Sequence, residues 1–392
     1  MMIARLACAW ASVAAFQIFG GTLLAQLGAP LPSLLIFAWL LGVIVWSAFG
    51  VVHEAEEIAH RLGEPYGTLI LTLSIVIIEV ALISAVMLGA KGAPTLGRDT
   101  MFAVLMIVLN GVVGIGLFIG GLRHFSQGYN LKGASAYLAV IIPLTLIPLV
   151  LPNFTTSTSD GTLTTFQSIA FSLFTLLLYG AFLILQTGRH SVFFKEPAGE
   201  SNMPYGAAYA RARVQPGSEP APAPAPEPDA EPSEEPPHPP SEGSTRSHVI
   251  LLLANILPIV ILAKSLAVVL DFGIARLGAP VALGGILIAM VVFTPECIAA
   301  LRAITTNQLQ RAINLCLGAA ASTLGLTVPA VLVIGLITGQ EVVLGLSGTN
   351  MVILSMTLLL STLTFTGTRT TMLEGAVHLS VFFVFLVLVF SP

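Results

Sequence analysis

Eleven apolar runs, each long enough to cross a bilayer, determine what this chain can fold into. They cover approximately residues 6–27, 33–52, 67–90, 101–121, 134–151, 165–186, 248–270, 280–302, 312–338, 343–365 and 371–390. A helix needs about 20 mostly apolar residues to cross the hydrocarbon core. Lipid offers no hydrogen bonds to the backbone, so runs of this length must be helices. The sequence predicts an all-α integral membrane protein with about 11 transmembrane helices.

The composition supports the same class. Only 9% of the residues are charged, whereas a soluble protein carries about 25%. The net charge of −4 comes largely from one acidic segment, so it says little about partners. No nucleic acid is expected as a partner, and the oligomeric state stays open. The expected partners are the lipid bilayer and inorganic cations. Cys8, Cys297 and Cys316 all lie in apolar runs, which argues against a disulfide framework.

The chain divides into two halves of five spans. Residues 1–30 form an extra N-terminal helix, too long for the apolar region of a signal peptide. Residues 31–190 form the first repeat, and 248–392 the second. Between them, residues 191–247 form a Pro/Glu-rich segment that cannot bury an apolar core and is expected to be a disordered cytoplasmic linker. Because five is odd, equivalent helices run in opposite directions, which is the inverted-repeat plan of secondary transporters.

The distribution of Lys and Arg predicts the orientation. Twelve of them fall on the N-terminal side of the membrane, and only Lys91, Arg98 and Arg276 fall on the other side. Cytoplasmic loops carry the excess of positive charge. The N-terminus is therefore expected in the cytoplasm and the C-terminus outside, in the inner (plasma) membrane of a bacterium.

Glu79 stands near the middle of the third apolar run, with Thr72 and Ser74 one to two turns before it. A charged side chain at mid-membrane costs about 2.5–3.5 kcal/mol on insertion scales, so such a residue indicates function. Carboxylate and hydroxyl oxygens suit hard cations such as Ca²⁺ or Na⁺. The alternative is a glutamate that only makes hydrogen bonds inside the bundle.

Glu296 lies at similar depth in the eighth run, within Phe-Thr-Pro-Glu-Cys. Thr294 followed by Pro295 is typical of a helix start. We therefore expect this span to be broken here, with free backbone groups near the carboxylate, as in the discontinuous helices of transporters. The alternative is a simple proline kink. Glu79 and Glu296 are the predicted ion and metal ligands, expected to face each other at the midplane and share one ion.

Other polar residues are weaker candidates. Asn110 and Ser322, the latter followed by Thr323, occur in the Gly-rich spans after the two glutamate helices. Each could support a ligand or make an interhelical hydrogen bond. Glu374 and His378 are four residues apart at the start of the last span. They are expected to be a structural pair, with a role in a proton path as the alternative.

These motifs resemble the bacterial calcium/proton antiporters of the ChaA type, in the cation/Ca²⁺ exchanger superfamily. The resemblance covers nearly the whole chain except the linker, and it rests on these stretches: His53 to Gly67, Ile78-Glu79-Val80, Gly120 to Arg123, Thr294 to Ala300, Asn307 to Gln310, Leu317-Gly318-Ala319, Thr327 to Ala330, and Leu373-Glu374-Gly375. It implies that Glu79 and Glu296 are the essential acidic residues of the two repeats.

The sequence departs from the superfamily in one respect. The usual Gly-Asn-Ala-x-Glu pattern is replaced by Val-Ile-Ile-Glu at Glu79 and by Phe-Thr-Pro-Glu at Glu296. The asparagine ligands that this pattern supplies are therefore missing. Ca²⁺, Na⁺ and K⁺ all remain open as the transported cation.

The expected function is secondary antiport, in which inward protons drive the export of Ca²⁺, Na⁺ or both by alternating access, with K⁺ as a further candidate. No permanently bound cofactor is expected. One alternative is an antiporter mainly for Na⁺ and K⁺ with little Ca²⁺ activity, and another is a passive channel. From another class, a membrane-embedded carboxylate enzyme is the rival, although an intramembrane aspartyl protease would need two Asp.

Shortening the linker between Pro216 and Ser244 is expected to leave transport largely intact, provided that the remaining residues still connect the halves. The candidate ion ligands all lie outside this segment. The measurement is cation-dependent proton flux in vesicles at matched expression. A deletion variant that folds normally but loses all flux would show that the linker regulates transport or gathers ions.

Overall fold

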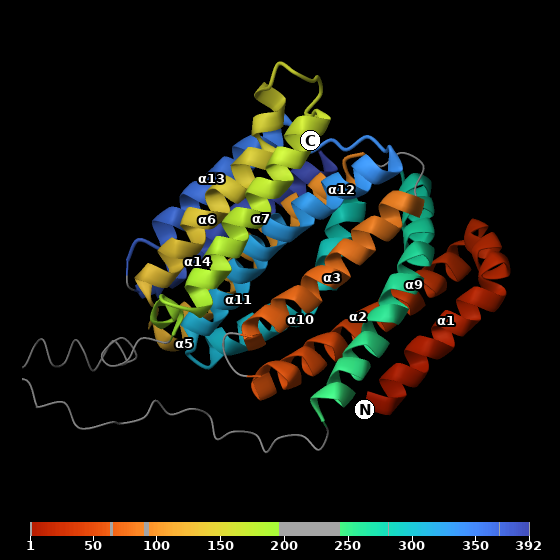
Figure 1. Cartoon of the computed structure of the whole chain (residues 1–392), viewed down its shortest axis with the longest axis horizontal. Helices are drawn as coiled ribbons and strands as arrows, with labels where there is room; N and C mark the ends of the chain where they lie inside the picture. The colour runs from red at the N-terminus through yellow and green to blue at the C-terminus, as the bar shows by residue number, and fades with distance from the viewer. Residues whose placement is uncertain are drawn as a thin grey trace, which may run out of the picture.

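The computed structural model describes residues 2–62, 66–89, 94–195, 244–280, 282–367 and 369–391. These residues form an almost wholly helical bundle (Figure 1). The predicted linker lies almost entirely outside the described residues, and so do Gly63, Glu64 and Pro65.

The elements follow the predicted spans closely, with η marking 3₁₀ or π-helical segments. In chain order they are α1 (Met2–Ala25), η1 (Gln26–Gly28), α2 (Pro30–Leu62), α3 (Tyr66–Gly89), α4 (Leu96–Leu105), η2 (Met106–Val112), α5 (Val113–His124), β1 (Ser126–Gly128), α6 (Leu131–Leu149), η3 (Leu151–Phe154), α7 (Thr165–Thr187), η4 (Ser191–Phe194), α9 (Thr245–Leu277), α10 (Ala282–Thr305), α11 (Leu309–Ser322), η6 (Thr323–Thr327), α12 (Val328–Thr338), α13 (Gly348–Thr364), β2 (Arg369–Thr371) and α14 (Met372–Phe390).

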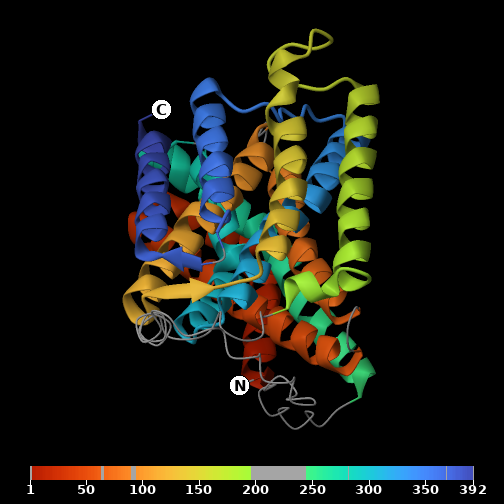
Figure 2. The ribbon, with the colours of Figure 1, turned by 90° about the vertical axis from the view of Figure 1, so that its left-hand side faces the viewer.

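The prediction of about eleven membrane helices is confirmed. Within the described ranges, nine helices are long and apolar enough to cross a membrane, and α4–η2–α5 and α11–η6–α12 each count as one. Two shorter apolar helices, Leu73–Ser84 in α3 and Gly348–Thr364, complete the set. The termini lie at opposite ends of the bundle, as an odd number of crossings requires (Figure 2).

Two short loop pairings tie the halves together, one at each end of the bundle (Figure 2). β1 pairs antiparallel with β2, so that Gln127 lies opposite Thr370. At the other end, an isolated bridge joins Thr162 to Val343. In both pairings, the loop after the third span of one half meets the loop before the last span of the other. The two contacts are thus related as inverted five-helix repeats predict.

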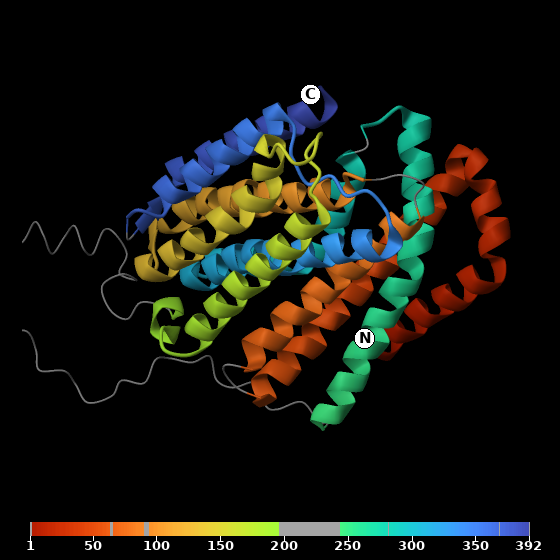
Figure 3. The ribbon, with the colours of Figure 1, turned by 45° about the horizontal axis from the view of Figure 1, so that its top comes forward.

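The extra helix α1 packs with α2 and α9 at one side of the molecule (Figures 1 and 3). A buried polar network joins the three helices. Arg5 of α1 donates from Nε to Asn255 Oδ1 of α9 at 3.1 Å, and its Nη2 lies 3.6 Å from Glu54 Oε1 of α2. His248 Nδ1 of α9 lies 2.9 Å from Glu54 Oε2. The charged end of α2 therefore carries one carboxylate that is completely buried.

Gly50 of α2 makes room for this network. A Cβ atom at this position would collide with Asn255 Oδ1 and Arg5 Nε, and it would lie 2.5 Å from Arg5 Cζ. The absence of a side chain thus lets the guanidinium reach between α2 and α9. Close approach through small residues is the usual way in which membrane helices pack.

Replacing Gly50 with Ala is expected to destabilise the protein by about 1–3 kcal/mol, because an overpacked site must displace the Arg5 guanidinium. The measurement is the midpoint of thermal unfolding in detergent. Gly42→Ala on the same helix is the matched control, since a Cβ there meets nothing within 4 Å. Equal midpoints for the two variants would contradict the role assigned to Gly50.

Candidate functional site

Glu79 lies in the middle of α3, where the surrounding residues are apolar and the carboxylate is completely buried. Its Oε2 accepts a hydrogen bond of 2.9 Å from Thr323 Oγ1 of η6. Thr327, at the other end of η6, faces the same carboxylate. Glu79 Oε1 has no hydrogen-bond partner in the part of the chain that the structure describes. The first half thus supplies the carboxylate, and the second half supplies its hydroxyl groups.

Glu296 of α10 borders a small, mostly apolar cavity. The cavity is lined by Val108, Val112, Phe293, Glu296, Cys297, Leu315, Cys316 and Ala319. The centre of a water molecule can occupy about 10 Å³ of this cavity, so the cavity has room for about one water. Glu296 Oε2 is buried and, among the described residues, meets no hydrogen-bond partner.

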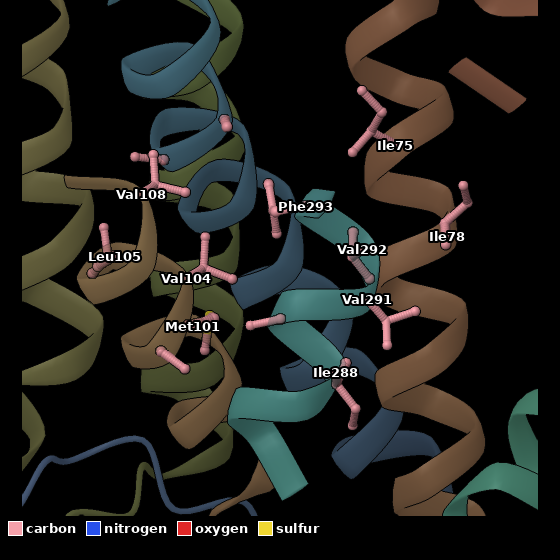
Figure 4. Close-up of a cluster of buried hydrophobic side chains, with 14 of the residues drawn as sticks. Ile75, Ile78, Met101, Val104, Leu105, Val108, Ile288, Val291, Val292 and Phe293 are labelled. Atoms are coloured by element: carbon pink, nitrogen blue, oxygen red, sulfur yellow. The ribbon is translucent and has the colours of Figure 1, made fainter. Parts of the chain in front are cut away.

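The two glutamates lie close enough for their charges to interact. They come from α3 and α10, which pack side by side. In Figure 4, Ile288 and Val291 of α10 lie on the side of Ile78 of α3, and Val104 of α4 lies on the other side of α10. Gly285 allows α10 to approach α4, since a Cβ there would lie 2.8 Å from the backbone nitrogen of Thr100.

Each glutamate helix is followed by a span that contains a π-helical segment. These are η2, Met106–Val112, and η6, Thr323–Thr327. Asn110 follows Glu79 by 31 residues, and Thr327 follows Glu296 by the same interval. A π-helical turn shifts the register of the side chains and is frequent at functional sites. The matched interval was the available signal for Thr327, which the sequence analysis did not select.

The predicted break in α10 is wrong. The helix runs without interruption from Ala282 to Thr305, with Pro295 inside it. Thr294 does not cap a new helix, because its hydroxyl donates to the carbonyl of Met290 one turn earlier, at 2.5 Å. A threonine that bonds back along its own helix is an alternative to capping. The irregular backbone lies instead in η2 and η6.

Among the supporting residues, Thr323 rather than Ser322 bonds to a glutamate. The Ser322 hydroxyl donates to Ala319 of its own helix, at 3.0 Å. Tyr179 of α7 lies beside Ser322 and near Glu296, and the sequence analysis missed it. On α3, Ser74 also bonds within its own helix, to the carbonyl of Ile70. The side chain of Thr72 lies outside the described residues.

Asn110 makes interhelical hydrogen bonds away from the glutamates. Its partners are Thr357 of α13 and His378 of α14. Glu374 accepts from the backbone N–H of Thr371 at 2.8 Å and so forms a capping box at the start of α14. Glu374 and His378 are thus held in separate contacts, one at the helix start and one inside the bundle.

The side chains around the two glutamates supply oxygen atoms as possible ligands but do not form a metal centre in advance. Among the described residues, no group of three or more His, Cys, Asp or Glu side chains could hold a metal ion together. Two carboxylates with unpartnered oxygens can instead bind protons, or contribute part of the ligand shell of a hard cation.

Thr323→Val keeps the shape of the side chain but removes the hydroxyl that bonds Glu79. We expect a loss of about 1–3 kcal/mol in the free energy of unfolding, because the buried carboxyl group is left without this partner. Thr323→Ser is the matched control, since it keeps the hydroxyl. Thermal unfolding in detergent compares the two variants. A valine variant as stable as the serine variant would show that this bond contributes no stability.

Comparison with known proteins gives consistent results. The model of the family described as sodium/calcium exchanger protein matches residues 32–188 and 247–391. The sodium-potassium/proton antiporter ChaA of Escherichia coli is 36% identical over 353 residues, covering 90% of this chain and 87% of that protein. The protein y4hA of Sinorhizobium fredii is 37% identical over 364 residues, covering 93% and 90%.

Two solved structures share the fold. Native YfkE superposes with a TM-score of 0.69 at 16% identity and covers 100% of both chains. The H⁺/Ca²⁺ exchanger CAX gives a TM-score of 0.64 at 14% identity, covering 98% of this chain and 87% of that one.

Proposed function

The chain belongs to the sodium/calcium exchanger protein family, and we propose that it is a secondary cation/proton antiporter in which Glu79 and Glu296 bind the exchanged ions. Inward protons drive the export of a cation. The observation that carries this proposal is the pair of interacting glutamates, each with one buried oxygen that has no hydrogen-bond partner among the described residues.

Charge balance explains how one pair of side chains can bind both ions. Two carboxylates in an apolar surrounding cannot both stay charged without compensation, because burying an uncompensated charge is very costly. Two protons compensate them, and so does one divalent cation. Exchange of two protons for one Ca²⁺ is therefore the simplest electroneutral cycle through this pair.

The ligand set favours hard cations. Both glutamates, Thr323 and Thr327 offer carboxylate and hydroxyl oxygens, which Ca²⁺ and Na⁺ prefer. Ca²⁺, Na⁺ and K⁺ are the candidates, and the name of the Escherichia coli relative gives Na⁺ and K⁺ as its cations. The fold neighbours include an H⁺/Ca²⁺ exchanger. Adding Ca²⁺, Na⁺ and K⁺ in turn to energised everted vesicles identifies the cation by the proton release that it causes.

Residues 31–190 and 248–392 act as two inverted repeats around the glutamates in this proposal, and rocking or sliding of helices exposes the pair to one side at a time. The N-terminus and the linker lie in the cytoplasm and the C-terminus outside, following the excess of Lys and Arg. The bacterial inner membrane is the proposed location. Family membership favours transport over a carboxylate enzyme.

Glu79→Gln and Glu296→Gln are each expected to abolish exchange while the protein still inserts and folds. Glutamine keeps the shape but neither releases a proton nor supplies charge, and we expect a fall of about 100-fold or more in cation affinity, beyond what lost outer-shell partners cause. The measurement is cation-induced proton release in everted vesicles at matched expression. Glu341→Gln is the control, since Glu341 is exposed in the loop after α12. Near-normal exchange by either variant would remove that glutamate from the mechanism.

A further inference from the structure

A second buried polar cluster lies between η2, α13 and α14, and neither glutamate takes part in it. Its members are Met106, Asn110, Thr357, Thr364 and His378, none of which exposes more than 5% of its surface. Buried polar groups are retained at a cost unless all their hydrogen bonds are made. The arrangement of these bonds indicates what the cluster does.

The hydrogen bonds of the cluster form a chain in which each donor and acceptor can be assigned. Asn110 Nδ2 donates to Thr357 Oγ1 at 2.8 Å, so Asn110 Oδ1 is left as an acceptor. His378 Nδ1 lies 3.1 Å from that oxygen and must carry the hydrogen. In the neutral ring Nε2 is then an acceptor, and the Thr364 hydroxyl lies 2.9 Å away to donate to it. Every polar atom of the ring and of the Asn110 amide has a partner.

The neutral imidazole fits this site better than the charged one. A proton on Nε2 would force the Thr364 hydroxyl to become an acceptor and to find another partner for its own hydrogen. Among the described residues, Glu374 is the charged side chain whose field reaches the ring. Its carboxylate is already engaged one turn away, with the backbone and hydroxyl of Thr371. The cluster therefore favours a ring that stays neutral and joins helices.

Close helix packing fixes the distance between His378 and η2. A Cβ on Gly114 of α5 would lie 3.1 Å from His378 Cβ. On α14, a Cβ on Gly375 would lie 2.8 Å from the carbonyl oxygen of Gly114. The two glycines let α14 lie directly against the span that contains η2, so the imidazole meets Asn110 without an intervening side chain.

The residues two positions before and after Asn110 line the Glu296 cavity. These are Val108 and Val112, on the same π-helical segment. We propose that His378 is a positioning residue that acts in its neutral form through Asn110. It holds η2 in place, so that Val108 and Val112 stay against Glu296 as one wall of the cavity. The consequence for transport rests on the proposed function, whereas the effect on η2 does not.

The test compares His378→Ala with His378→Gln and with Ser380→Ala. Glutamine offers one amide donor and one acceptor in a plane, and it cannot carry a proton. Ser380 is the matched control, since its hydroxyl bonds only to Ala376 of the same helix in the described structure. The first readout is the rate at which N-ethylmaleimide alkylates Cys297 and Cys316 of the cavity, followed by peptide mass spectrometry. Cys8 of α1 serves as an internal reference.

His378→Ala is expected to raise the alkylation rate of Cys297 or Cys316 by about three- to tenfold, the range given by the loss of one buried hydrogen bond. Cys8 is expected to react at the wild-type rate. The second readout is vesicle exchange, in which the apparent KM for the cation rises more than the maximal rate falls. His378→Gln is expected to restore most of both values, and Ser380→Ala to match the wild type.

Two results would overturn the proposal. Thiol rates and KM in His378→Ala equal to those in Ser380→Ala would show that the ring does not hold η2. Failure of His378→Gln to rescue His378→Ala at equal expression and thermal stability would show that a neutral donor and acceptor at this position do not hold η2. Absence of exchange in the wild-type protein would reject the proposed function alone, because the alkylation readout needs no transport.

Discussion

A carboxylate inside a hydrocarbon layer needs a compensating charge, a proton or hydrogen-bond donors. This need explains the surroundings of Glu79 and Glu296 at the centre of the bundle. The two halves meet these needs unequally. Glu79 receives a hydroxyl from the opposite half, whereas Glu296 faces an almost apolar cavity. Neither glutamate has a basic residue beside it among the described contacts, so in the proposed function protons or a transported cation supply the compensating charge. A permanent ion pair at this place would leave no carboxylate free to exchange ions.

Two other buried clusters of the bundle combine polar groups of complementary chemistry, whereas the glutamate pair brings two acids together. Arg5, Glu54, Asn255 and His248 compensate one another at the end of the bundle where α1, α2 and α9 meet. Asn110, Thr357 and His378 do so between η2, α13 and α14. In both places a glycine allows the close approach of helices, Gly50 in the first and Gly114 in the second.

The sequence predicted the spans, their number, the inverted halves and a pair of glutamates within the apolar spans, because a long apolar run and a lone carboxylate within it are strong local signals. It did not predict which hydroxyl meets Glu79. Ser322 and Thr323 are neighbours with similar chemistry, and the choice depends on the π-helical register of η6. The break expected at Thr294-Pro295 was wrong because a threonine hydroxyl can bond back along its own helix. The burial of Glu54 depends on Arg5 and His248, which are far away in the sequence, so no local pattern predicts it.

The bond between Thr323 and Glu79 crosses from one half of the chain to the other, which has a consequence for how such a protein can arise. A single five-span unit, made alone, would hold a carboxylate and no complementary hydroxyl. It would gain one only by meeting a copy of itself inserted upside down in the same membrane. Joining two units in one polypeptide fixes their opposite insertion and their one-to-one ratio. Once joined, the two carboxylates are free to diverge, and the unequal surroundings of Glu79 and Glu296 are the kind of difference that such freedom permits.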